Sequence, residues 1–389
     1  MLAGALAASS PATAISLRDA AAAAGIHVGA AANSFEIGTP AGDLLVREFD
    51  SLTPENEMKW SQLSPAPFVY DFESSDALVA FAEANAMRVR GHTFVWGRPN
   101  GPTDWLAADL AAATDPAARL QALMLDQIAT VGDRYAGRIH TWDVVNEPLV
   151  YASGALDASS PYFALLGETF LADAFRAARA ADPYARLYLN ETNTERLPGK
   201  FASLLALAEG LLARDVPLDG IGLQGHFLAA PRKADLLAQL RAIEALGLEA
   251  EITELDLPLL LFATSTDPLA AQARAYADVF SACLEVSACK GITMWGISDA
   301  HTWLDTQPFF EFYAPNQPLL FDAQGLPKPA YDAVLATLLA VPEPGTAAVV
   351  GLGLGALAIR RRARRCMPGR SRTEGMAPAG RDSRFCRTC

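Results

Sequence analysis

The chain has 389 residues, of which 51% are hydrophobic, and this is enough to bury a large core. The formal net charge is −13, but residues 360–389 carry ten Arg against two acidic residues, or +8, which leaves −21 for the rest. A body this acidic argues against a nucleic acid partner, because nucleic acids select basic surfaces, and it favours a neutral polymer or a small molecule as ligand.

The N-terminal stretch is small and apolar over its first 14 residues and ends near "SPATA". This composition is typical of the end of a secretory signal, although no basic segment precedes it. We therefore interpret residues 1–16 as a truncated signal or leader and expect the folded domain to span residues 17–340.

Within 17–340, strand-like runs alternate with Ala/Leu-rich helical patterns. The helical patterns cover 77–87, 117–135, 170–182, 201–215, 233–247 and 272–286, and the eight strand-like runs cover 27–33, 49–55, 88–96, 139–147, 186–191, 219–227, 249–257 and 291–299. Such alternation indicates βαβ units and a parallel sheet. Eight units predict an α/β fold with a single catalytic domain, a (β/α)8 TIM barrel. An open doubly wound sheet is the alternative, but it needs a phosphate-binding turn after the first strand, which is absent here.

Polar residues recur where these predicted strands end. They are Glu55, His92, Glu147, Asn190, His226, Glu254 and Asp299. The carboxyl ends of barrel strands form the active face, so we expect these side chains to share one site.

Two of these strand ends carry carboxylates in otherwise apolar surroundings, "TWDVVNE" and "ITELD". Glu147 and Glu254, meeting over one cleft, are the minimum set for glycoside hydrolysis, in which one stays protonated and the other ionised. Side chains two positions apart on a strand share a face, so the side chains of Asp143 and Glu147 point to the same face. Asn146 has the opposite orientation and reaches the cleft only if its strand ends there. Ion pairing inside the barrel is the alternative role, but no Lys or Arg is next to either motif.

The second motif also has a supporting histidine within reach. His226 can hydrogen-bond Glu254, and Asp256 can orient that histidine. The five His residues are scattered, whereas a metal-dependent barrel hydrolase needs clustered ones. We therefore expect no metal and no cofactor.

Several motifs in order give the body a resemblance to glycoside hydrolase family 10, the barrel endo-β-1,4-xylanases. They are "LTPENEMKW", "RGHTFVW", "WDVVNE", "GIGLQGH", "ITELD", "CLEVSACKGITMWGISD" and "PLLFDAQGLPKPAY". The resemblance runs from about Leu17 to Leu339 and implies a retaining mechanism with Glu147 as acid/base and Glu254 as nucleophile. It further implies that substrate is bound by Glu55, Asn56, Lys59, His92, Trp96, Asn146, Gln224, His226, Trp295 and Trp303, supported from behind by Asp143 and Asp256.

The implied substrate is xylan or a xylo-oligosaccharide. A related barrel β-glycanase acting on cellulose or mixed β-glucan is the alternative, and a catalytically inactive carbohydrate-binding barrel is a further one. Some positions depart from the family's pattern: Gly97 replaces a second His after the Trp, "NETN" brings Glu191 and Thr192 beside the site, Leu304 stands where Arg is common, and Trp105 is left to supply a loop tryptophan. These departures affect the leaving-group side more than the chemistry.

The cysteines fall into two groups. Cys283 and Cys289 lie in the body with five residues between them, and Cys366, Cys386 and Cys389 lie in the basic tail. The spacing of the first pair allows either a local disulfide or two buried thiols. The family resemblance implies the disulfide.

The C-terminal segment is "VPEPGTAAVVGLGLGALAIRRRARR", in which Pro-Glu-Pro precedes a 14-residue apolar stretch and an Arg cluster. The order resembles a PEP-CTERM sorting signal over residues 341–365, followed by a basic tail at 366–389. The resemblance implies a protein that is secreted or placed on the surface of a Gram-negative bacterium, after transient membrane association through this segment. We expect a monomer.

Overall fold

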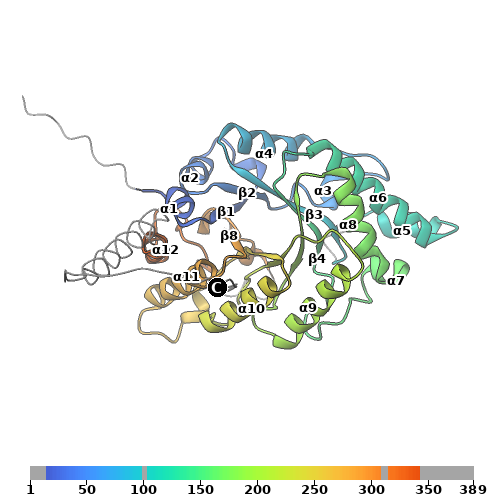
Figure 1. Ribbon diagram of the computed structural model, residues 1–389. Helices are drawn as coiled ribbons and strands as arrows, with labels where there is room; N and C mark the ends of the chain where they lie inside the picture. The colour runs from blue at the N-terminus through green and yellow to red at the C-terminus, as the bar shows by residue number, and fades with distance from the viewer. Residues whose placement is uncertain (1–14, 99–102, 308–313, 342–389) are drawn as a thin grey trace, which may run out of the picture. The chain divides into compact units, whose positions relative to one another are not determined.

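The computed structural model describes residues 15–98, 103–307 and 314–341. Eight parallel strands follow one another around a closed barrel, each paired with its sequence neighbours, and the last strand pairs with the first. Figure 1 looks into this barrel with the helices around it. The predicted (β/α)8 fold is confirmed. The strands are β1 (His27–Ala32), β2 (Ser51–Pro54), β3 (Arg88–Trp96), β4 (Thr141–Asn146), β5 (Arg186–Glu191), β6 (Gly220–Leu223), β7 (Glu249–Leu255) and β8 (Cys289–Met294).

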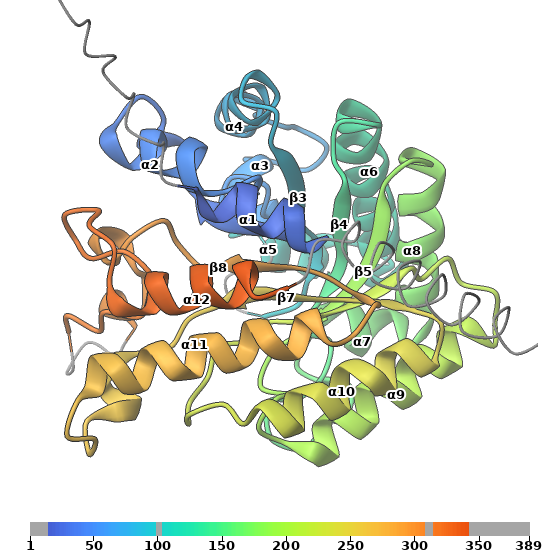
Figure 2. The ribbon, with the colours of Figure 1, turned by 60° about the vertical axis from the view of Figure 1, so that its left-hand side comes forward.

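The helices cover the outside of the barrel, and the second view shows several of them running along it (Figure 2). All six predicted helical patterns fall on helices. The prediction missed short helices and the pair α1 and α12, which pack against each other. The helices are α1 (Leu17–Ala24), α2 (Pro40–Glu48), α3 (Trp60–Leu63), α4 (Glu73–Ala84), α5 (Leu106–Ala112), α6 (Pro116–Tyr135), α7 (Pro161–Leu166), α8 (Thr169–Ala181), α9 (Pro198–Leu212), α10 (Lys233–Ala245), α11 (Pro268–Leu284) and α12 (Pro329–Leu339), with 3₁₀ turns η1 (Ser34–Glu36), η2 (Leu259–Phe262), η3 (Asp299–His301) and η4 (Trp303–Thr306).

Local sequence signals explain where the long helices begin. In α6 and α11 a proline occupies the first turn, where its missing N–H costs nothing. The preceding Asp115 and Asp267 each accept a hydrogen bond at 3.0 Å from a backbone N–H in that first turn. The strands are buried on both faces, as parallel barrel strands must be, so they appear in the sequence as apolar runs rather than alternating ones.

A buried charge network fills part of the barrel interior. The Arg90 guanidinium donates to Asp143 and, at 2.7 Å, to Glu251. Burial alone would raise the pKa of Glu251, but Arg90 and His27 outweigh it and hold that pKa at about 2. Asp143, paired in the same way, is thus a structural anion beneath the active face rather than a group open to the cleft.

A disulfide joins Cys283 at the end of α11 to Cys289 at the start of β8, with the two Cα atoms 5.3 Å apart. The pairing implied by the family resemblance is therefore confirmed. Most of the predicted leader (1–14), almost all of the predicted sorting segment and the whole basic tail (together 342–389) lie outside the described residues. Within the described ranges, no helix is long and apolar enough to cross a bilayer.

Candidate active site

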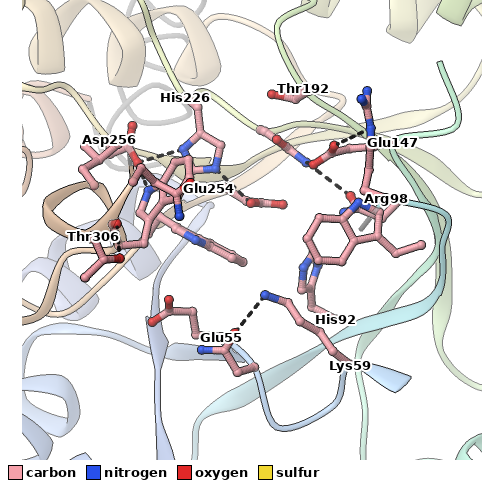
Figure 3. Close-up of a pocket in the computed structure, with 18 of the residues that line it drawn as sticks. Glu55, Lys59, His92, Arg98, Glu147, Thr192, His226, Glu254, Asp256 and Thr306 are labelled. Carbon is pink, nitrogen blue, oxygen red and sulfur yellow. Dashed lines mark hydrogen bonds and ion pairs between the residues drawn. The ribbon is translucent and has the colours of Figure 1, made fainter. Parts of the chain in front are cut away.

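A cleft of about 980 Å³ opens across the carboxyl ends of the strands (Figure 3). Both predicted catalytic residues and all ten predicted substrate-binding residues line it: Glu147, Glu254, Glu55, Asn56, Lys59, His92, Trp96, Asn146, Gln224, His226, Trp295 and Trp303. They come from segments up to 248 positions apart in the chain, from Glu55 to Trp303. The barrel topology, which gathers strand ends at one face, is what brings them together.

Of the polar residues expected to gather at this site, Asp299 lies elsewhere, and Asp143 lies behind the cleft as expected. Asp299 does not line the cleft; it accepts a 2.9 Å hydrogen bond from the buried ammonium of Lys328 and a 2.8 Å bond from the Leu319 N–H. The expectation that it shares the site is wrong, because its strand ends earlier, at Met294, and the chain has already turned away. Asp143 lies below the cleft, where it binds the His92 ring at 2.9 Å.

Glu254, near the end of β7, is held on both carboxylate oxygens. Its Oε2 accepts from His226 Nε2 at 3.0 Å and its Oε1 from Asn190 Nδ2 at 2.7 Å. Burial would raise the pKa of Glu254, but the hydrogen bond from His226 and the charge of His92 bring it below its usual range. Glu254 is therefore an ionised carboxylate.

His226 lies between two carboxylates. Its Nδ1 donates to Asp256 at 2.8 Å while its Nε2 donates to Glu254. Burial would lower the pKa of His226, but Asp256 and Glu254 raise it well above its ordinary value, so the ring is a cation. Asp256 also accepts from Trp303 Nε1 at 2.8 Å, and it lines the cleft itself, whereas it was expected to lie behind the cleft residues.

Glu147 follows the last residue of β4 and has a left-handed backbone with φ of +52°. Such a conformation costs about 1–3 kcal/mol for a residue with a side chain, and it is fixed here by a 2.9 Å bond from the Glu147 N–H to the Asn190 carbonyl. One carboxylate oxygen accepts from Gln224 Nε2 at 3.0 Å, and the other lies 3.3 Å from Arg98 Nε. The first contact is a hydrogen bond, whereas the second is an ion-pair approach in which Arg98 Nε makes no hydrogen bond among the described residues.

The contact with Arg98 corrects the sequence argument that no cation accompanies this motif. Arg98 comes from the segment after β3, 49 positions before Glu147, so adjacency along the chain could not reveal it. The same guanidinium donates to the Leu149 carbonyl at 3.0 Å and lies 3.8 Å from Asp157. Arg98 therefore fastens the segment after β4 to the segment after β3.

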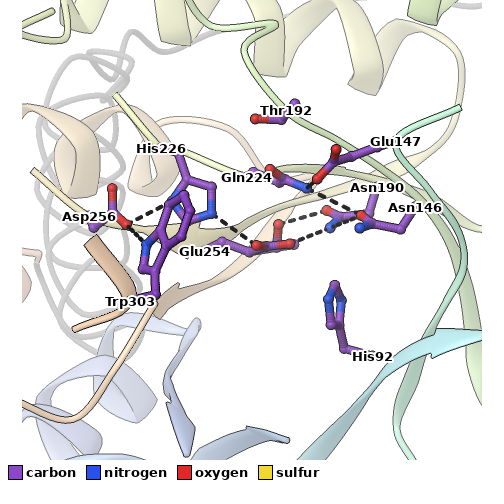
Figure 4. Close-up of polar contacts among 12 residues, drawn as sticks. His92, Asn146, Glu147, Asn190, Thr192, Gln224, His226, Glu254, Asp256 and Trp303 are labelled. Carbon is purple, nitrogen blue, oxygen red and sulfur yellow. Dashed lines mark hydrogen bonds and ion pairs between the residues drawn. The ribbon is translucent and has the colours of Figure 1, made fainter. Parts of the chain in front are cut away.

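A chain of amides links the two carboxylates (Figure 4). The carbonyl oxygen of Asn146 accepts from Asn190 at 2.9 Å and from Gln224 at 3.2 Å, and these two amides in turn donate to Glu254 and Glu147. Asn146 is the last residue of β4, and the register of that strand shifts between Asp143 and Val145, so strict alternation no longer applies. Among the described residues no partner takes the Asn146 amide nitrogen, which is therefore free to donate to a ligand.

A second cluster of polar side chains lies at the cleft, in the segments that follow β1 and β2. Asn33 donates to Glu55 at 2.7 Å and accepts from Asn56 at 3.0 Å, and Lys59 donates to Asn56 at 3.0 Å. Burial lowers the pKa of Lys59, while the charges of Glu254 and Glu55 oppose that change. The Lys59 ammonium also lies 5.2 Å from the centre of the Trp96 ring.

Aromatic rings form much of the remaining lining. The ring of Trp295 meets the His92 ring edge-on at 5.3 Å, and the ring of Trp303 lies 4.8 Å from that of His226. The indole nitrogen of Trp96 is buried without a hydrogen-bond partner among the described residues. Trp105 does not line the cleft; it packs edge-on against Trp60.

Two of the departures from the family pattern, Glu191 and Gly97, contact the segment after β4. Glu191 is fully buried beside Lys200 at 2.8 Å and accepts from the Leu149 N–H at 3.0 Å. Burial raises the pKa of Glu191 to about 7, against the opposing charge of Lys200. Gly97 packs against the same segment, since any Cβ there would come within 2.7 Å of the Ser160 Cβ.

Sequence reasoning did not identify several cleft residues. Arg98, Tyr151, Thr192, Phe227 and Leu228 all line it. Thr192 was noted only as a change beside the site, and the others carry no motif of their own. Within the described ranges no group of three or more His, Cys, Asp or Glu side chains is placed to hold a metal ion.

A (β/α)8 barrel with an ionised carboxylate, a second carboxylate on another strand and an aromatic, amide-rich cleft has the architecture of a glycoside hydrolase. Comparison with known proteins is specific on this point. The family model "Glycosyl hydrolase family 10" matches residues 16–337, and the model "PEP-CTERM protein-sorting motif" matches residues 340–365. The chain belongs to glycosyl hydrolase family 10.

Individual relatives agree with this assignment. Endo-1,4-beta-xylanase A of Phanerodontia chrysosporium is 34% identical over 313 residues, covering 79% of this chain and 73% of the relative. Endo-1,4-beta-xylanase 3 of Hypocrea jecorina is 38% identical over 296 residues, covering 76% and 77%. The crystal structure of xylanase 10B from Thermotoga petrophila RKU-1 in complex with xylobiose superposes with a TM-score of 0.76 at 33% identity, covering 85% of this chain and 98% of that one.

Proposed function

We propose that the protein is a retaining endo-1,4-β-xylanase that cleaves internal β-1,4-xylosidic bonds of xylan. The observation that carries this proposal is the pairing of a buried, ionised Glu254 with a more open Glu147 across one cleft. Double displacement needs two carboxyl groups with different roles in one cleft: an ionised one that attacks and a second one that gives and takes a proton. The relatives named as xylanases supply the substrate class.

In the first step Glu254 attacks the anomeric carbon while Glu147 gives its proton to the glycosidic oxygen. The bond from carbon to that oxygen breaks, the leaving sugar departs with the proton, and a covalent glycosyl-enzyme forms. In the second step Glu147 takes a proton from water, the hydroxide attacks the same carbon, and Glu254 leaves as carboxylate. His226 keeps the free Glu254 carboxylate ionised before it attacks and after it departs, and the hydrogen bonds from His226 and Asn190 hold the side chain in place.

The remaining cleft residues bind the sugars. The free amide nitrogen of Asn146 donates to the 2-hydroxyl of the sugar next to the scissile bond. Glu55, Asn56 and Lys59 hold sugars on the non-reducing side, together with His92 and Trp96. Trp295 and Trp303 offer aromatic faces to the apolar faces of the rings. Gln224 orients Glu147, and Asp256 orients both His226 and Trp303.

The matched sorting motif supports an extracellular or cell-surface protein. We further propose that residues 1–16 are a leader, that 17–340 form the catalytic domain, that 341–365 are recognised and removed at a membrane of a Gram-negative bacterium, and that 366–389 are a basic tail. The mature enzyme acts as a monomer. Mass spectrometry of the mature protein from its host tests the removal of the sorting segment. A chain that still extends past Arg365 contradicts that removal.

The activity is tested by measuring reducing-sugar release from xylan, cellulose and mixed β-glucan under identical conditions. We expect xylan to be cleaved fastest, with viscosity falling early because internal bonds are cut. Glu254→Gln, prepared in parallel, corrects for contaminating activity. Preference for cellulose or mixed glucan contradicts the substrate assignment, and binding of xylan without any sugar release contradicts catalysis.

A further inference from the structure

A second pocket, of about 440 Å³, shares no lining residue with the cleft. It is formed mainly by the segments that follow β1 and β8, and these two strands pair with each other in the barrel. Phe35 of η1 and His301 of η3 stand at its edge, with their ring centres 5.4 Å apart and their planes at 82°. None of the roles assigned so far uses these residues.

Phe35 is exposed to an unusual degree for a residue on a rigid turn. Its side chain is 62% exposed, although apolar surface of this size is normally buried. The turn that carries it is fixed: the Asn33 N–H donates to Glu36 at 2.9 Å, and the Ser34 N–H donates to Glu57 at 2.5 Å. The backbone of Phe35 is therefore held in place, and its ring contacts the His301 ring while most of its surface stays exposed.

Two short stretches of chain connect residues at or beside the cleft with residues of this pocket, although the two share no lining residue. Asn33, which binds Glu55 and Asn56 in the cleft, precedes Phe35 by two residues. Trp303, a cleft residue, follows His301 by two residues. Two residues span at most about 7 Å, so the Phe35 backbone lies close to Asn33, the partner of Glu55, and the His301 backbone lies close to Trp303. In the view of Figure 3, Glu55 and Glu147 lie on opposite sides of Glu254.

The chemistry of the lining suits a sugar ring. The phenyl face of Phe35 can cover the apolar face of a pyranose, while the His301 ring, Gln324 and Arg47 offer polar groups at its edge. We propose that this pocket is a distal sugar-binding site for the non-reducing end of the xylan chain, beyond the sugars held by Glu55 and Asn56. The inference rests on the proposed function, because it takes the direction of the bound chain from it.

The site makes the enzyme sensitive to chain length on one side of the scissile bond. A short substrate that fills only the two sugar positions next to Glu254 does not reach Phe35. A xylohexaose molecule reaches Phe35 only when three or more of its units lie on the non-reducing side. Loss of Phe35 therefore disfavours those binding modes and moves cleavage toward the non-reducing end.

The test compares Phe35→Ala and His301→Ala with wild type on an aryl β-xylobioside and on xylohexaose labelled at its reducing end. We expect kcat/KM on xylohexaose to fall about two- to tenfold for Phe35→Ala, which is the range of a single aromatic contact, and less for His301→Ala. The value on the aryl xylobioside stays unchanged, and the labelled products shift toward cleavage near the non-reducing end. Tyr184→Ala is the matched control, because Tyr184 is 78% exposed and precedes β5 on the opposite face of the barrel.

Each other outcome is decisive. Unchanged xylohexaose kinetics, an unchanged cleavage position, or an equal loss on both substrates refutes the distal site, and so does an equal effect of Tyr184→Ala. Thermal unfolding of each variant identifies a loss that arises from misfolding. A wild-type enzyme that does not hydrolyse the aryl xylobioside contradicts the proposed function itself, whereas one that hydrolyses it and ignores the Phe35 change contradicts this inference alone.

Discussion

The two carboxylates of the cleft are held in different ways. Glu254 has a side chain only 5% exposed and is bound by a cationic histidine and an amide, all carried on barrel strands or directly after them. Glu147 is 16% exposed, has a left-handed backbone, and shares its oxygens between Gln224 and the guanidinium of Arg98, which follows β3. One environment is closed and fixes a charge; the other is open at the point where a leaving group departs and water enters.

This contrast matches what each step requires. The nucleophile is a carboxylate before the first displacement, a neutral ester in the intermediate and a carboxylate again after the second, so a rigid pocket that stabilises the free carboxylate serves both its attack and its departure. A residue that gives and then takes a proton needs partners that tolerate both of its states. We call the surroundings of Glu254, with His226, Asn190 and Asp256, the closed region, and the surroundings of Glu147, with Gln224 and Arg98, the open region. The following variants test whether the closed region carries more of the catalysis than the open region.

The largest effect is expected for Glu254→Gln. Removing the nucleophile should lower kcat on xylan and on an activated aryl xylobioside alike by at least about a thousandfold, because no covalent intermediate can form. The rates are measured by sugar and phenolate release. Glu251→Gln is the matched control, since it removes another buried acid from β7 but one that pairs with Arg90; it should lower the unfolding temperature and keep most activity. Comparable losses in both variants would contradict the role of Glu254.

The second-largest effect is expected for Glu147→Gln, and its size should depend on the leaving group of the substrate. Loss of general acid catalysis should slow xylan cleavage by about 10²–10⁴-fold. A dinitrophenyl xylobioside departs without a proton, so its first step should stay fast while the second step slows. Stopped-flow measurement should then show a burst of about one dinitrophenolate per enzyme. A variant that is equally slow on both substrates and shows no burst would assign Glu147 a different role.

His226→Gln should have an intermediate effect with a defined pH signature. A hydrogen bond to a charged group contributes about 1.5–3 kcal/mol, so we expect kcat/KM to fall about 10- to 100-fold. Glu254 must be ionised to attack, and His226 holds its pKa low; without His226 that pKa rises, and the acidic limb of the pH profile should move to higher pH. The exposed His140, outside the cleft, gives the control variant His140→Gln. An unmoved acidic limb would contradict the electrostatic role of His226.

Arg98→Gln should have the smallest effect. The Arg98 side chain is 25% exposed, and partly exposed ion pairs contribute up to about 1 kcal/mol. We expect kcat/KM on xylan to fall two- to fivefold, about the range that such a pair allows, as the segment after β4 loosens. Arg232→Gln, which breaks a surface pair with Asp235, is the control. A loss as large as that of His226→Gln would show that the open region carries more of the catalysis than its geometry implies.

The surroundings of Glu254 could be predicted from the sequence better than the surroundings of Glu147. The closed region was predictable because its parts follow strand ends, and barrel topology alone brings strand ends to one face. His226 and Asp256 were placed beside Glu254 for that reason, and the hydrogen bonds at 3.0 and 2.8 Å confirm the contacts. The apolar runs, alternating with Ala/Leu-rich helical patterns, likewise predicted all eight strands.

The open region was less predictable because loops build it. Nothing in the alternation of strands and helices indicates that Arg98 reaches Glu147 or that Trp105 turns to pack on Trp60. Asp299 failed for a related reason: it follows β8 in sequence, but five residues beyond the strand end a loop can direct a side chain anywhere. Asn146 reaches the cleft under the condition that the sequence argument set, because β4 ends at that residue, and the register shift between Asp143 and Val145 also interrupts the alternation.

The close approach of Gly97 to Ser160 has a practical consequence for redesign of this enzyme. The segments after β3 and β4 are shaped to each other, since the absence of a side chain at 97 is the space that Ser160 occupies. Grafting either segment alone from a relative with a larger residue at that position would force the other to move, together with Glu147 and Arg98. The two segments therefore form one exchangeable module, and a library that varies leaving-group preference should replace them together.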